Sequence, residues 1–414
     1  MAKVQDEVFA KSDYILADEQ QQTGPLTKGQ VIIIGAGAGG LSTAYALKRS
    51  GISATIVERS DKVGSSWRNR HPQLQLNTVR TLSHLPGLSL PANAGDFPAR
   101  DTLIQYLEDY VQFIDVPIDY GVEVKQIQKT IKGWCVSTSK GDYEAPHLVV
   151  ASGQDRVPYI PDWPGKSSYR GKILHSANFG DLRQYIDKRV LVVGAGNSGS
   201  DILNHLATIN TKSVDISVRY GPTISPERKF GIPIQRLAPF LERLPAWAID
   251  KFMAFSEKLT YGDLTKYGFQ KHPLGGASRI QQQGITPAVD KGFVAALKAG
   301  RMEVVAEIKS FDETGVILMN GKRLEPEFVV CATGYNTGLE NLFGPLAVLN
   351  ETGLPLINGA ESMEQAPGLR FIGMRPSLSG NFYSACRDSV LIAEAILSET
   401  ELSSASGHCR GKNV

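Results

Sequence analysis

Two glycine-rich turns are the clearest chemical signal in the sequence. One lies in QVIIIGAGAGGLS at 30–42 and the other in RVLVVGAGNSGSDI at 189–202. In a G-x-G-x-x-G turn the first glycine permits a tight bend, the second lets the backbone approach a pyrophosphate, and the third lets helix and strand pack closely. The amides that open the following helix then bind the phosphate charge. The glycines concerned are Gly35, Gly37 and Gly40 in the first turn, and Gly194, Gly196 and Gly199 in the second.

The residue at the end of the next strand distinguishes the two turns. Glu58 follows Gly40 by 18 residues, where a carboxylate accepts hydrogen bonds from ribose hydroxyls and repels a 2′-phosphate. Arg219 follows Gly199 by 20 residues, and a guanidinium there can pair with a 2′-phosphate. We therefore predict FAD or NAD in the first unit and NADPH in the second. A flavin in the first unit would explain why one chain has both, since hydride could pass between domains that face each other.

Each glycine turn needs a parallel sheet to position it. Val31–Ile34 and Ala54–Val57 have the composition of buried strands, and the segment LSTAYALKRS between them is typical of a helix. The same order recurs with Val190–Val193 and Val214–Val218 around SDILNHLATI. Strand, turn, helix and strand form a βαβ unit. The predicted fold class is α/β with two Rossmann-like dinucleotide-binding domains.

A second repeat bears on how the domains are connected. HLVVASGQ at 147–154 and FVVCATGY at 328–335 are both apolar strands that end in Ala-x-Gly. If both strands belong to the first sheet, the NADPH domain is inserted into the FAD domain. The expected division is an N-terminal extension at 1–29, an FAD domain at 30–160 and 327–402, an NADPH domain at 161–326, and a flexible tail at 403–414.

Composition excludes several other classes of protein. Hydrophobic residues make up 42% and charged residues 21% of the chain, and the net charge is only +2, so nucleic acid is not an expected partner. The first 29 residues lack the apolar stretch of a secretory leader, and no segment has about 18 uninterrupted apolar residues. There is no firm membrane signal, and we expect a cytoplasmic protein. Four cysteines without a C-x-x-C pair give no metal or dithiol site, and a homodimer is expected on general frequency.

A linker motif points to a known family. In YRGKILHSANFG at 169–180, the residues Tyr169, Gly171, His175 and Phe179 have the spacing F-x-G-x-x-x-H-x-x-x-[FYW]. This resembles the identifying motif of flavin-containing monooxygenases, which use FAD and NADPH. GSSW at 64–67 and ATGY at 332–335 extend the resemblance from about residue 30 to about 396. The segment GITPAVDKGFVAALKAGRMEVV looks most like plant YUCCA enzymes and their bacterial relatives, which convert indole-3-pyruvate to indole-3-acetate.

The resemblance implies a reaction with O2. Reduced flavin would form a C4a-(hydro)peroxide that transfers one oxygen atom to a small organic substrate, while retained NADP protects the intermediate. Asn77 matches an asparagine that amine- and sulfur-oxidising members place beside the flavin, and it is the expected catalytic residue; YUCCA enzymes have histidine there. Phe179 is followed by Gly180, unlike the Trp and Pro or Asp of type I Baeyer–Villiger enzymes. Indole-3-pyruvate-like acids, amines, sulfides and ketones all remain candidate substrates.

The resemblance also implies roles for residues outside the glycine turns. His175 is expected to align the two domains rather than act as a base. The additional residues expected to bind cofactor are Arg59, Ser66, Trp67, Asn77, Val124, Asn197, Ser198, Thr333 and Gly334.

Two alternative functions stay open. An NADPH-dependent flavin reductase that passes electrons to a protein partner shares both dinucleotide domains, although the missing C-x-x-C counts against a thioredoxin-reductase type. A non-catalytic nucleotide sensor would share the turns without the chemistry. The apolar stripe between Leu237 and Met253 is expected to be domain core or a lid over the substrate. A surface that associates with a membrane is the less favoured interpretation of the same stripe.

Overall fold

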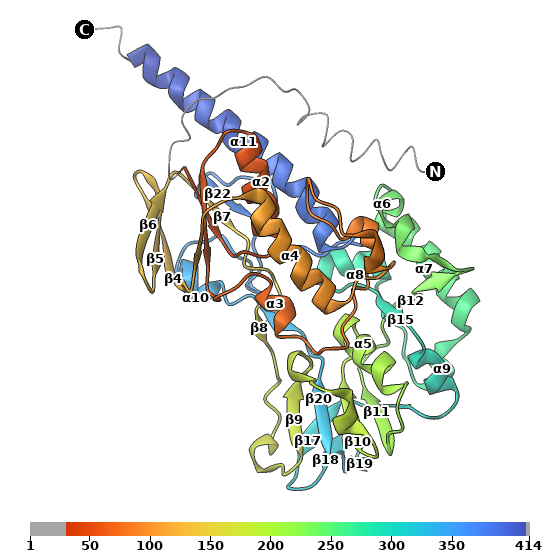
Figure 1. Ribbon diagram of the computed structural model, residues 1–414. Helices are drawn as coiled ribbons and strands as arrows, with labels where there is room; N and C mark the ends of the chain where they lie inside the picture. The colour runs from red at the N-terminus through yellow and green to blue at the C-terminus, as the bar shows by residue number, and fades with distance from the viewer. Residues whose placement is uncertain (1–29, 411–414) are drawn as a thin grey trace.

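The computed structural model describes residues 30–410, with side chains described for 30–402. It has two lobes, each built on a five-stranded parallel sheet (Figure 1). The first sheet has the order β22-β7-β1-β2-β3. Its strands are β1 (Val31–Ile34), β2 (Ala54–Glu58), β3 (Ile118–Tyr120), β7 (His147–Val150) and β22 (Leu369–Phe371).

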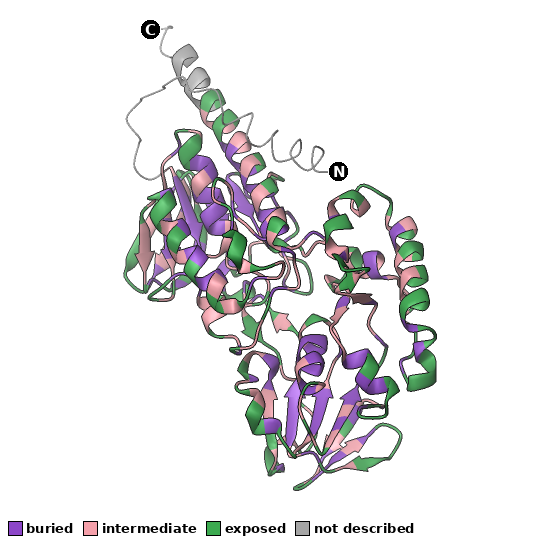
Figure 2. Cartoon of the chain, turned by 45° about the vertical axis from the view of Figure 1, so that its right-hand side comes forward, coloured by how far each residue is buried: buried purple, intermediate pink, exposed green. Residues whose placement is uncertain are grey.

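Alternation along β1 divides the first lobe into three layers. Val31 and Ile33 pack with a cluster that includes helix residues such as Leu41 and Leu107, whereas Ile32 and Ile34 pack on the opposite side. The helices are α2 (Ala38–Arg49), α4 (Arg100–Ile114) and α11 (Asn381–Arg410). The opposite layer is an antiparallel sheet of β4 (Val124–Thr130), β5 (Gly133–Thr138) and β6 (Gly141–Ala145). Because both faces are covered, the central strands are largely buried, as Figure 2 shows.

The second lobe repeats this plan. Its sheet has the order β16-β11-β10-β20-β9, and all its pairs are parallel. The strands are β9 (Lys172–His175), β10 (Arg189–Val193), β11 (Ser213–Ser217), β16 (Glu303–Val305) and β20 (Phe328–Cys331). Helices α5 (Asn197–Leu206) and α9 (Phe293–Lys298) contribute to the core on one face. The antiparallel strands β17 (Ile308–Phe311), β18 (Val316–Leu318) and β19 (Arg323–Leu324) contribute to the core on the other.

The strand β20 lies in the second sheet, so the expectation that both Ala-x-Gly strands belong to the first sheet is wrong. β7 pairs with β1, and β20 pairs with β10 in the same parallel sense. Each Ala-x-Gly strand therefore flanks the glycine turn of its own sheet, and the two are equivalent parts of a duplicated unit. Burial and β-branching predict that a strand is central but not to which sheet it belongs. The strands of the second sheet still lie between β7 and β22 in the sequence. The second lobe is therefore inserted into the first, and the chain returns to the first lobe after β20.

Helices near the junction of the lobes form a third region, on the right of Figure 1. It contains α6 (Ala238–Leu241), α7 (Ala246–Tyr261) and α8 (Gly276–Gln283), with β12 (Ile224–Pro226) pairing with β15 (Ala288–Asp290). Other short elements are α3 (Ser65–Arg68), α10 (Glu340–Phe343), the pair β13 (Arg228–Lys229) and β14 (Ile232–Pro233), and the pair β8 (Val157–Pro158) and β21 (Tyr335–Asn336).

The expectations for the two ends of the chain have different outcomes. Helix α11 continues to Arg410, so the expectation that ordered structure ends at Leu402 is wrong for 403–410. The expected N-terminal extension at 1–29 and the last residues, 411–414, lie outside the described residues. Within the described part of the chain, no helix combines the length and apolar character needed to cross a membrane.

Candidate functional site

The first glycine turn has the geometry of a pyrophosphate cradle. Gly35 has φ +104°, a conformation that side chains disfavour. A Cβ atom on Gly40 would lie 1.9 Å from the carbonyl oxygen of Gly35, whereas nothing lies within 4 Å of the same position on Gly37. Helix α2 then begins with no side-chain cap and no acidic residue in its first turn. Its first amides therefore have no side-chain acceptor, as an anion site at a helix N-terminus requires.

Glu58 lies directly beside this turn. Its Oε2 accepts a hydrogen bond from the amide of Ala36 at 2.8 Å, and its Oε1 accepts one from the amide of Ser60 at 2.9 Å. These bonds hold the carboxylate at the carboxyl end of β2, next to the first turn. Because each carboxylate oxygen has two lone pairs, it retains the capacity to accept hydrogen bonds from ribose hydroxyls.

The second turn repeats the cradle. Gly194 has φ +93°, and a Cβ on Gly199 would lie 2.0 Å from the carbonyl oxygen of Gly194. The position on Gly196 is again free of protein atoms within 4 Å. Helix α5 also begins without a side-chain cap or an early acidic residue. Both turns therefore fit a dinucleotide by the same steric argument.

Arg219 lies at the end of the strand that follows this second turn, as expected, but it has an acidic partner. Its Nε donates to Glu307 Oε1 at 3.0 Å, and its Nη2 donates to the same oxygen at 2.8 Å. Both side chains line the cavity described next. Glu307 follows β16, 88 residues away, so neither a motif nor the spacing around Arg219 indicated this ion pair.

A cavity of about 1150 Å³ joins the two lobes. This exceeds the usual range of about 300–1,000 Å³ for one small-molecule site, so it has room for more than one ligand. The predicted site residues that line it are Trp67, Asn77, Gly194, Gly196, Asn197, Ser198, Arg219, Thr333 and Gly334. Those that do not are Gly35, Gly37, Gly40, Glu58, Arg59, Ser66, Val124 and Gly199.

Three of the residues outside the cavity lining differ in what they offer a cofactor. Arg59 follows β2 directly and is exposed, and Ser66 is exposed on α3. The side chain of Val124 is buried in the core beneath the first sheet, which leaves only its backbone for a cofactor contact.

Asn77 links the lobes at the cavity wall. Its Nδ2 donates to Oδ1 of Asn197 at 3.1 Å, and Nδ2 of Asn197 donates to Oγ1 of Thr286 at 2.9 Å. The indole ring of Trp67, which also lines the cavity, lies 6.1 Å from the ring of Phe382, measured between centroids. The segment from Trp67 to Asn77 thus presents both an aromatic ring and an amide to the enclosed space.

The linker motif has structural contacts. His175 Nε2 donates to the carbonyl oxygen of Gly334 at 2.9 Å, while its Nδ1 accepts from the amide of Ala177 at 3.1 Å. A Cβ on Gly171 would lie 2.5 Å from the ring of Tyr169, whose hydroxyl donates to the Pro326 carbonyl. These bonds fix the Ala-Thr-Gly-Tyr segment that follows β20. Burial is the main cause that lowers the pKa of His175, which keeps the ring neutral at pH 7.

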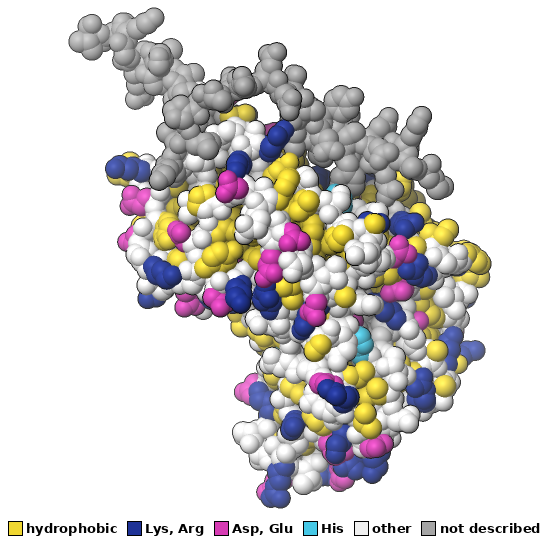
Figure 3. All heavy atoms as spheres, viewed as in Figure 1, with side chains coloured by type: hydrophobic (Ala, Val, Ile, Leu, Met, Phe, Trp, Pro, Cys, Tyr) yellow, Lys and Arg dark blue, Asp and Glu magenta, His cyan; other side chains and the backbone are white. Residues whose placement is uncertain are grey.

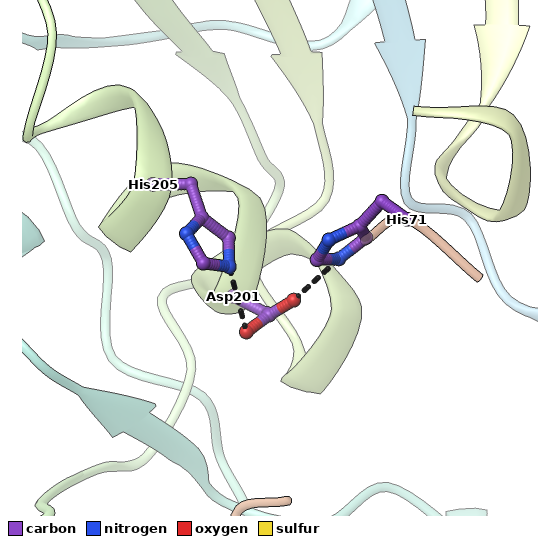
Figure 4. A group of neighbouring side chains, drawn as sticks. All are labelled: His71, Asp201 and His205. Carbon is purple, nitrogen blue, oxygen red and sulfur yellow. Dashed lines mark hydrogen bonds and ion pairs between the residues drawn. The ribbon is translucent and has the colours of Figure 1, made fainter. Parts of the chain in front are cut away.

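A buried histidine–aspartate cluster at the lobe junction was not predicted from the sequence. Nε2 of His71, from the first lobe, lies 2.9 Å from Oδ2 of Asp201 on α5, and Nε2 of His205 lies 3.6 Å from Oδ1 of the same carboxylate (Figure 4). Asp201 and His205 share a helix face at i, i+4 spacing, but His71 is 130 residues away. These are metal-ligating residue types whose ligand atoms lie within 4.8 Å of one another. The direct bond joins His71 and Asp201, but the buried Nδ1 of His71 and Nε2 of His205 have no hydrogen-bond partner.

Helices α6 and α7 cover the cavity on one side. Leu241 and Met253 line it, whereas Trp247 and Phe255 are 63% and 67% exposed. The exposed members of the stripe are therefore not domain core, and hydrophobic side chains gather at the edge of the molecule over these helices in Figure 3. Acidic groups of α7 face inward: Asp250 accepts from the amide of Ala277, and Glu257 accepts from that of Ile224.

The chain is similar to known proteins over most of its length. The family model described as pyridine nucleotide-disulphide oxidoreductase matches residues 32–235. The probable indole-3-pyruvate monooxygenase YUCCA9 of Arabidopsis thaliana is 31% identical over 379 residues, which covers 88% of each chain. The chain belongs to the flavin-containing monooxygenase family. It is a flavin monooxygenase that uses FAD and NADPH.

Other relatives of this flavin monooxygenase agree in sequence or in fold. Indole-3-pyruvate monooxygenase YUCCA1 of Oryza sativa subsp. japonica is 31% identical over 313 residues, 74% of this chain and 77% of the relative. The solved flavin-containing monooxygenase of Stenotrophomonas maltophilia has a TM-score of 0.68 at 21% identity, covering 90% and 100% of the two chains. The bacillithiol disulfide reductase of Staphylococcus aureus has a TM-score of 0.64 at 18% identity, with 90% and 99% covered. The fold is thus shared with a reductase, and only the sequence relatives indicate oxygenation.

Proposed function

We propose that the enzyme inserts one atom of O2 into a small organic substrate that binds in the cavity between the lobes, and that a 2-oxo acid like indole-3-pyruvate is the leading candidate. The observation that carries the proposal is one cavity lined by Asn77 and Trp67 of the first lobe and by Gly196 and Arg219 of the second. A cavity lined from both lobes could receive the reacting ends of both cofactors. The names of the plant relatives, at about a third identity, direct attention to indole-3-pyruvate.

The glycine turns and their strand-end residues would hold the cofactors. Gly35, Gly37, Gly40 and Glu58 would bind FAD, with Arg59, Ser66, Trp67 and the backbone of Val124 as further contacts. Gly194, Gly196, Asn197, Ser198, Gly199 and Arg219 would bind NADPH, and Thr333 and Gly334 would contact cofactor at the lobe junction. When bound, reduced flavin supplies the chemistry that activates O2. The domain boundaries at 30–160, 161–326 and 327–402 stay a prediction, with the strand β20 moved to the NADPH side.

Asn77 would donate a hydrogen bond toward the reacting oxygen. Its Nδ2 already faces the cavity wall through the bond to Asn197, and a fixed donor in a water-poor site stabilises developing negative charge. The lid formed by α6 and α7 would exclude water, which limits wasteful release of peroxide. NADP that stays bound after hydride transfer would complete the wall at the Asn197 end.

For a 2-oxo acid the reaction balances as substrate, O2, NADPH and a proton giving the shortened acid, CO2, NADP⁺ and water. The test is to measure NADPH consumption, product and H2O2 together for an indole-3-pyruvate-type acid, an amine, a sulfide and a ketone. One class should consume NADPH and form product in a ratio close to one, with little H2O2. Equal peroxide release with all four classes would reject oxygenation of these substrates.

The second candidate is an NADPH-dependent flavin reductase that transfers electrons to a protein partner. The likeness of fold to the bacillithiol disulfide reductase favours keeping it. Rapid reduction of cytochrome or ferredoxin without oxygenated product would support it. We further propose a cytoplasmic location and a homodimer, the latter checked by light scattering on the FAD-loaded protein.

A further inference from the structure

The ion pair between Arg219 and Glu307 alters how the second cradle can treat a phosphate. The carboxylate occupies the Nε and Nη2 edge of the guanidinium, which is the forked edge that would otherwise grip a phosphate. Glu307 also brings a negative charge to the same place. A 2′-phosphate that approaches Arg219 must therefore compete with a carboxylate, whereas neutral ribose hydroxyls could donate to it.

A second guanidinium at this corner has no such competitor. Arg279 lines the cavity from α8, and its Nη1 approaches the carbonyl oxygen of Gly221 at 3.5 Å, the outer limit for a hydrogen bond. Gly221 lies two residues after Arg219, so Arg279 reaches the segment that follows the strand end, and both residues line the cavity. Among the residues that the structure describes, no carboxylate pairs with Arg279, and its buried Nε has no hydrogen-bond partner.

An unpaired, partly buried cation costs free energy unless an anion completes it. Burial is the only cause acting on the pKa of Arg279, which it lowers, in contrast to Arg219, whose pKa is raised first by its hydrogen bond to Glu307. Arg279 therefore has an unpaired Nε, whereas Nε and Nη2 of Arg219 are both paired with Glu307. The position beside the strand-end segment favours a phosphate on the adenosine ribose over an anion at the lobe junction.

We propose that Arg279 is the principal residue for the 2′-phosphate of NADPH, and that Glu307 weakens discrimination between NADPH and NADH by occupying Arg219. The ligand class is an adenine dinucleotide with a ribose phosphate. This inference rests on the assignment of the second lobe to NADPH and replaces Arg219 as its main phosphate contact. In this proposal Glu307 affects the preference for NADPH over NADH indirectly, through its ion pair with Arg219.

The test measures binding to the FAD-loaded, full-length protein by calorimetry, with NADP⁺, NAD⁺, 2′,5′-ADP and 5′-AMP as probes. Losing a charge-assisted contact to phosphate should weaken binding about 10- to 100-fold. Arg279→Gln should therefore raise the Kd of NADP⁺ and 2′,5′-ADP by that factor and change the Kd of NAD⁺ less than about threefold. Arg219→Gln should have a smaller effect on the NADP⁺ to NAD⁺ ratio.

The variant Glu307→Gln is expected to bind NADP⁺ more tightly than the unchanged protein. Removing the competing carboxylate should tighten NADP⁺ about three- to tenfold and leave or weaken NAD⁺. Arg170→Gln, at an exposed ion pair with Glu313 outside the cavity, is the matched control and should change neither ligand. FAD content and melting temperature show whether each variant folds, and Glu307→Gln tests the proposal even if Arg279→Gln does not.

The inference is overturned if Arg279→Gln changes NADP⁺ and NAD⁺ equally or changes neither, or if Glu307→Gln leaves their ratio unaltered. These outcomes leave the enzyme's flavin chemistry intact. Failure of the wild-type protein to bind either dinucleotide would instead contradict the assignment of the second lobe, so the two failures are distinguishable. An Arg279 that bound a substrate carboxylate would give normal NADP⁺ binding in the variant.

Discussion

Asn77 of the first lobe donates its side-chain amide to Asn197, the first residue of helix α5 in the second lobe, at 3.1 Å. One residue that the sequence placed beside the flavin therefore touches one that it placed beside NADPH. This contact makes Asn77 sensitive to both ligands at once. Its replacement should affect how well the reaction is coupled more than how tightly either cofactor binds.

We expect Asn77→Leu to keep NADPH oxidation but to release most of the reducing equivalents as H2O2. Removing one preorganised donor commonly costs about 10²- to 10³-fold in the step that it assists. The measurement is the ratio of product to NADPH consumed, with FAD content as a folding check. Thr286→Val, which removes the partner of Asn197 without touching Asn77, is the control; a loss of coupling in both variants alike would argue against a direct role for Asn77.

The first glycine turn allows a prediction with an internal control. Gly40→Ala would place Cβ against the carbonyl oxygen of Gly35, so it should lower the melting temperature of the FAD-free protein. Gly37→Ala meets no protein atom and should leave that melting temperature within a few degrees while abolishing retention of FAD. Flavin absorbance after gel filtration reads the second effect. Stable retention of FAD by Gly37→Ala would contradict the cradle.

The histidine–aspartate cluster at the lobe junction predicts that two variants lose different amounts of unfolding free energy. Asp201→Asn leaves the buried His71 without a charged acceptor, which should lower the free energy of unfolding by about 1–3 kcal/mol. His205→Gln should cost less, because its nitrogen lies 3.6 Å from the carboxylate. Chemical denaturation of both variants checks the order. A larger loss from His205→Gln would point instead to a bound ion held by all three side chains.

Stability should fall as the solution becomes acidic. Burial lowers the pKa of His175 in the folded protein, so the unfolded chain binds its proton more readily. The contribution is present above the ordinary histidine value of about 6.5 and is lost as pH falls below it toward the folded pKa. Unfolding free energies at pH 7.5 and 5.5 should show this slope, and His175→Gln should flatten it. An unchanged slope in the variant would assign the effect to His147 or His205, whose pKa values burial also lowers.

The parts of the molecule with local signals could be predicted from the sequence. Four β-branched residues before Gly35, and the apolar run Val190–Val193 before Gly194, define strands whose turns and helices follow within a few residues. The placement of Glu58 and Arg219 at strand ends follows from the length of a βαβ unit. Of the two glycine turns, only the second contributes residues to the lining of the cavity, and the binding of cofactor at either turn stays a prediction.

Contacts made across long sequence separations could not be predicted. Nothing near Arg219 indicates Glu307, and nothing near Asp201 indicates His71, because these pairs depend on how separate strands and lobes pack. The misassigned strand β20 has the same cause: its apolar residues predict burial on both faces, which either sheet provides. The apolar stripe on α6 and α7 could be assigned only as domain core or a lid, because spacing alone does not show which side of a helix meets the protein.

Oxygen insertion is the central claim, and isotope labelling tests it most directly. FAD-loaded enzyme is incubated with NADPH, ¹⁸O2 and the substrate class that couples best, and the product is analysed by mass spectrometry. The account predicts one ¹⁸O atom in each product molecule and about one NADPH consumed per product. Product without label, or NADPH oxidation that yields only H2O2 or a reduced protein partner, would contradict it.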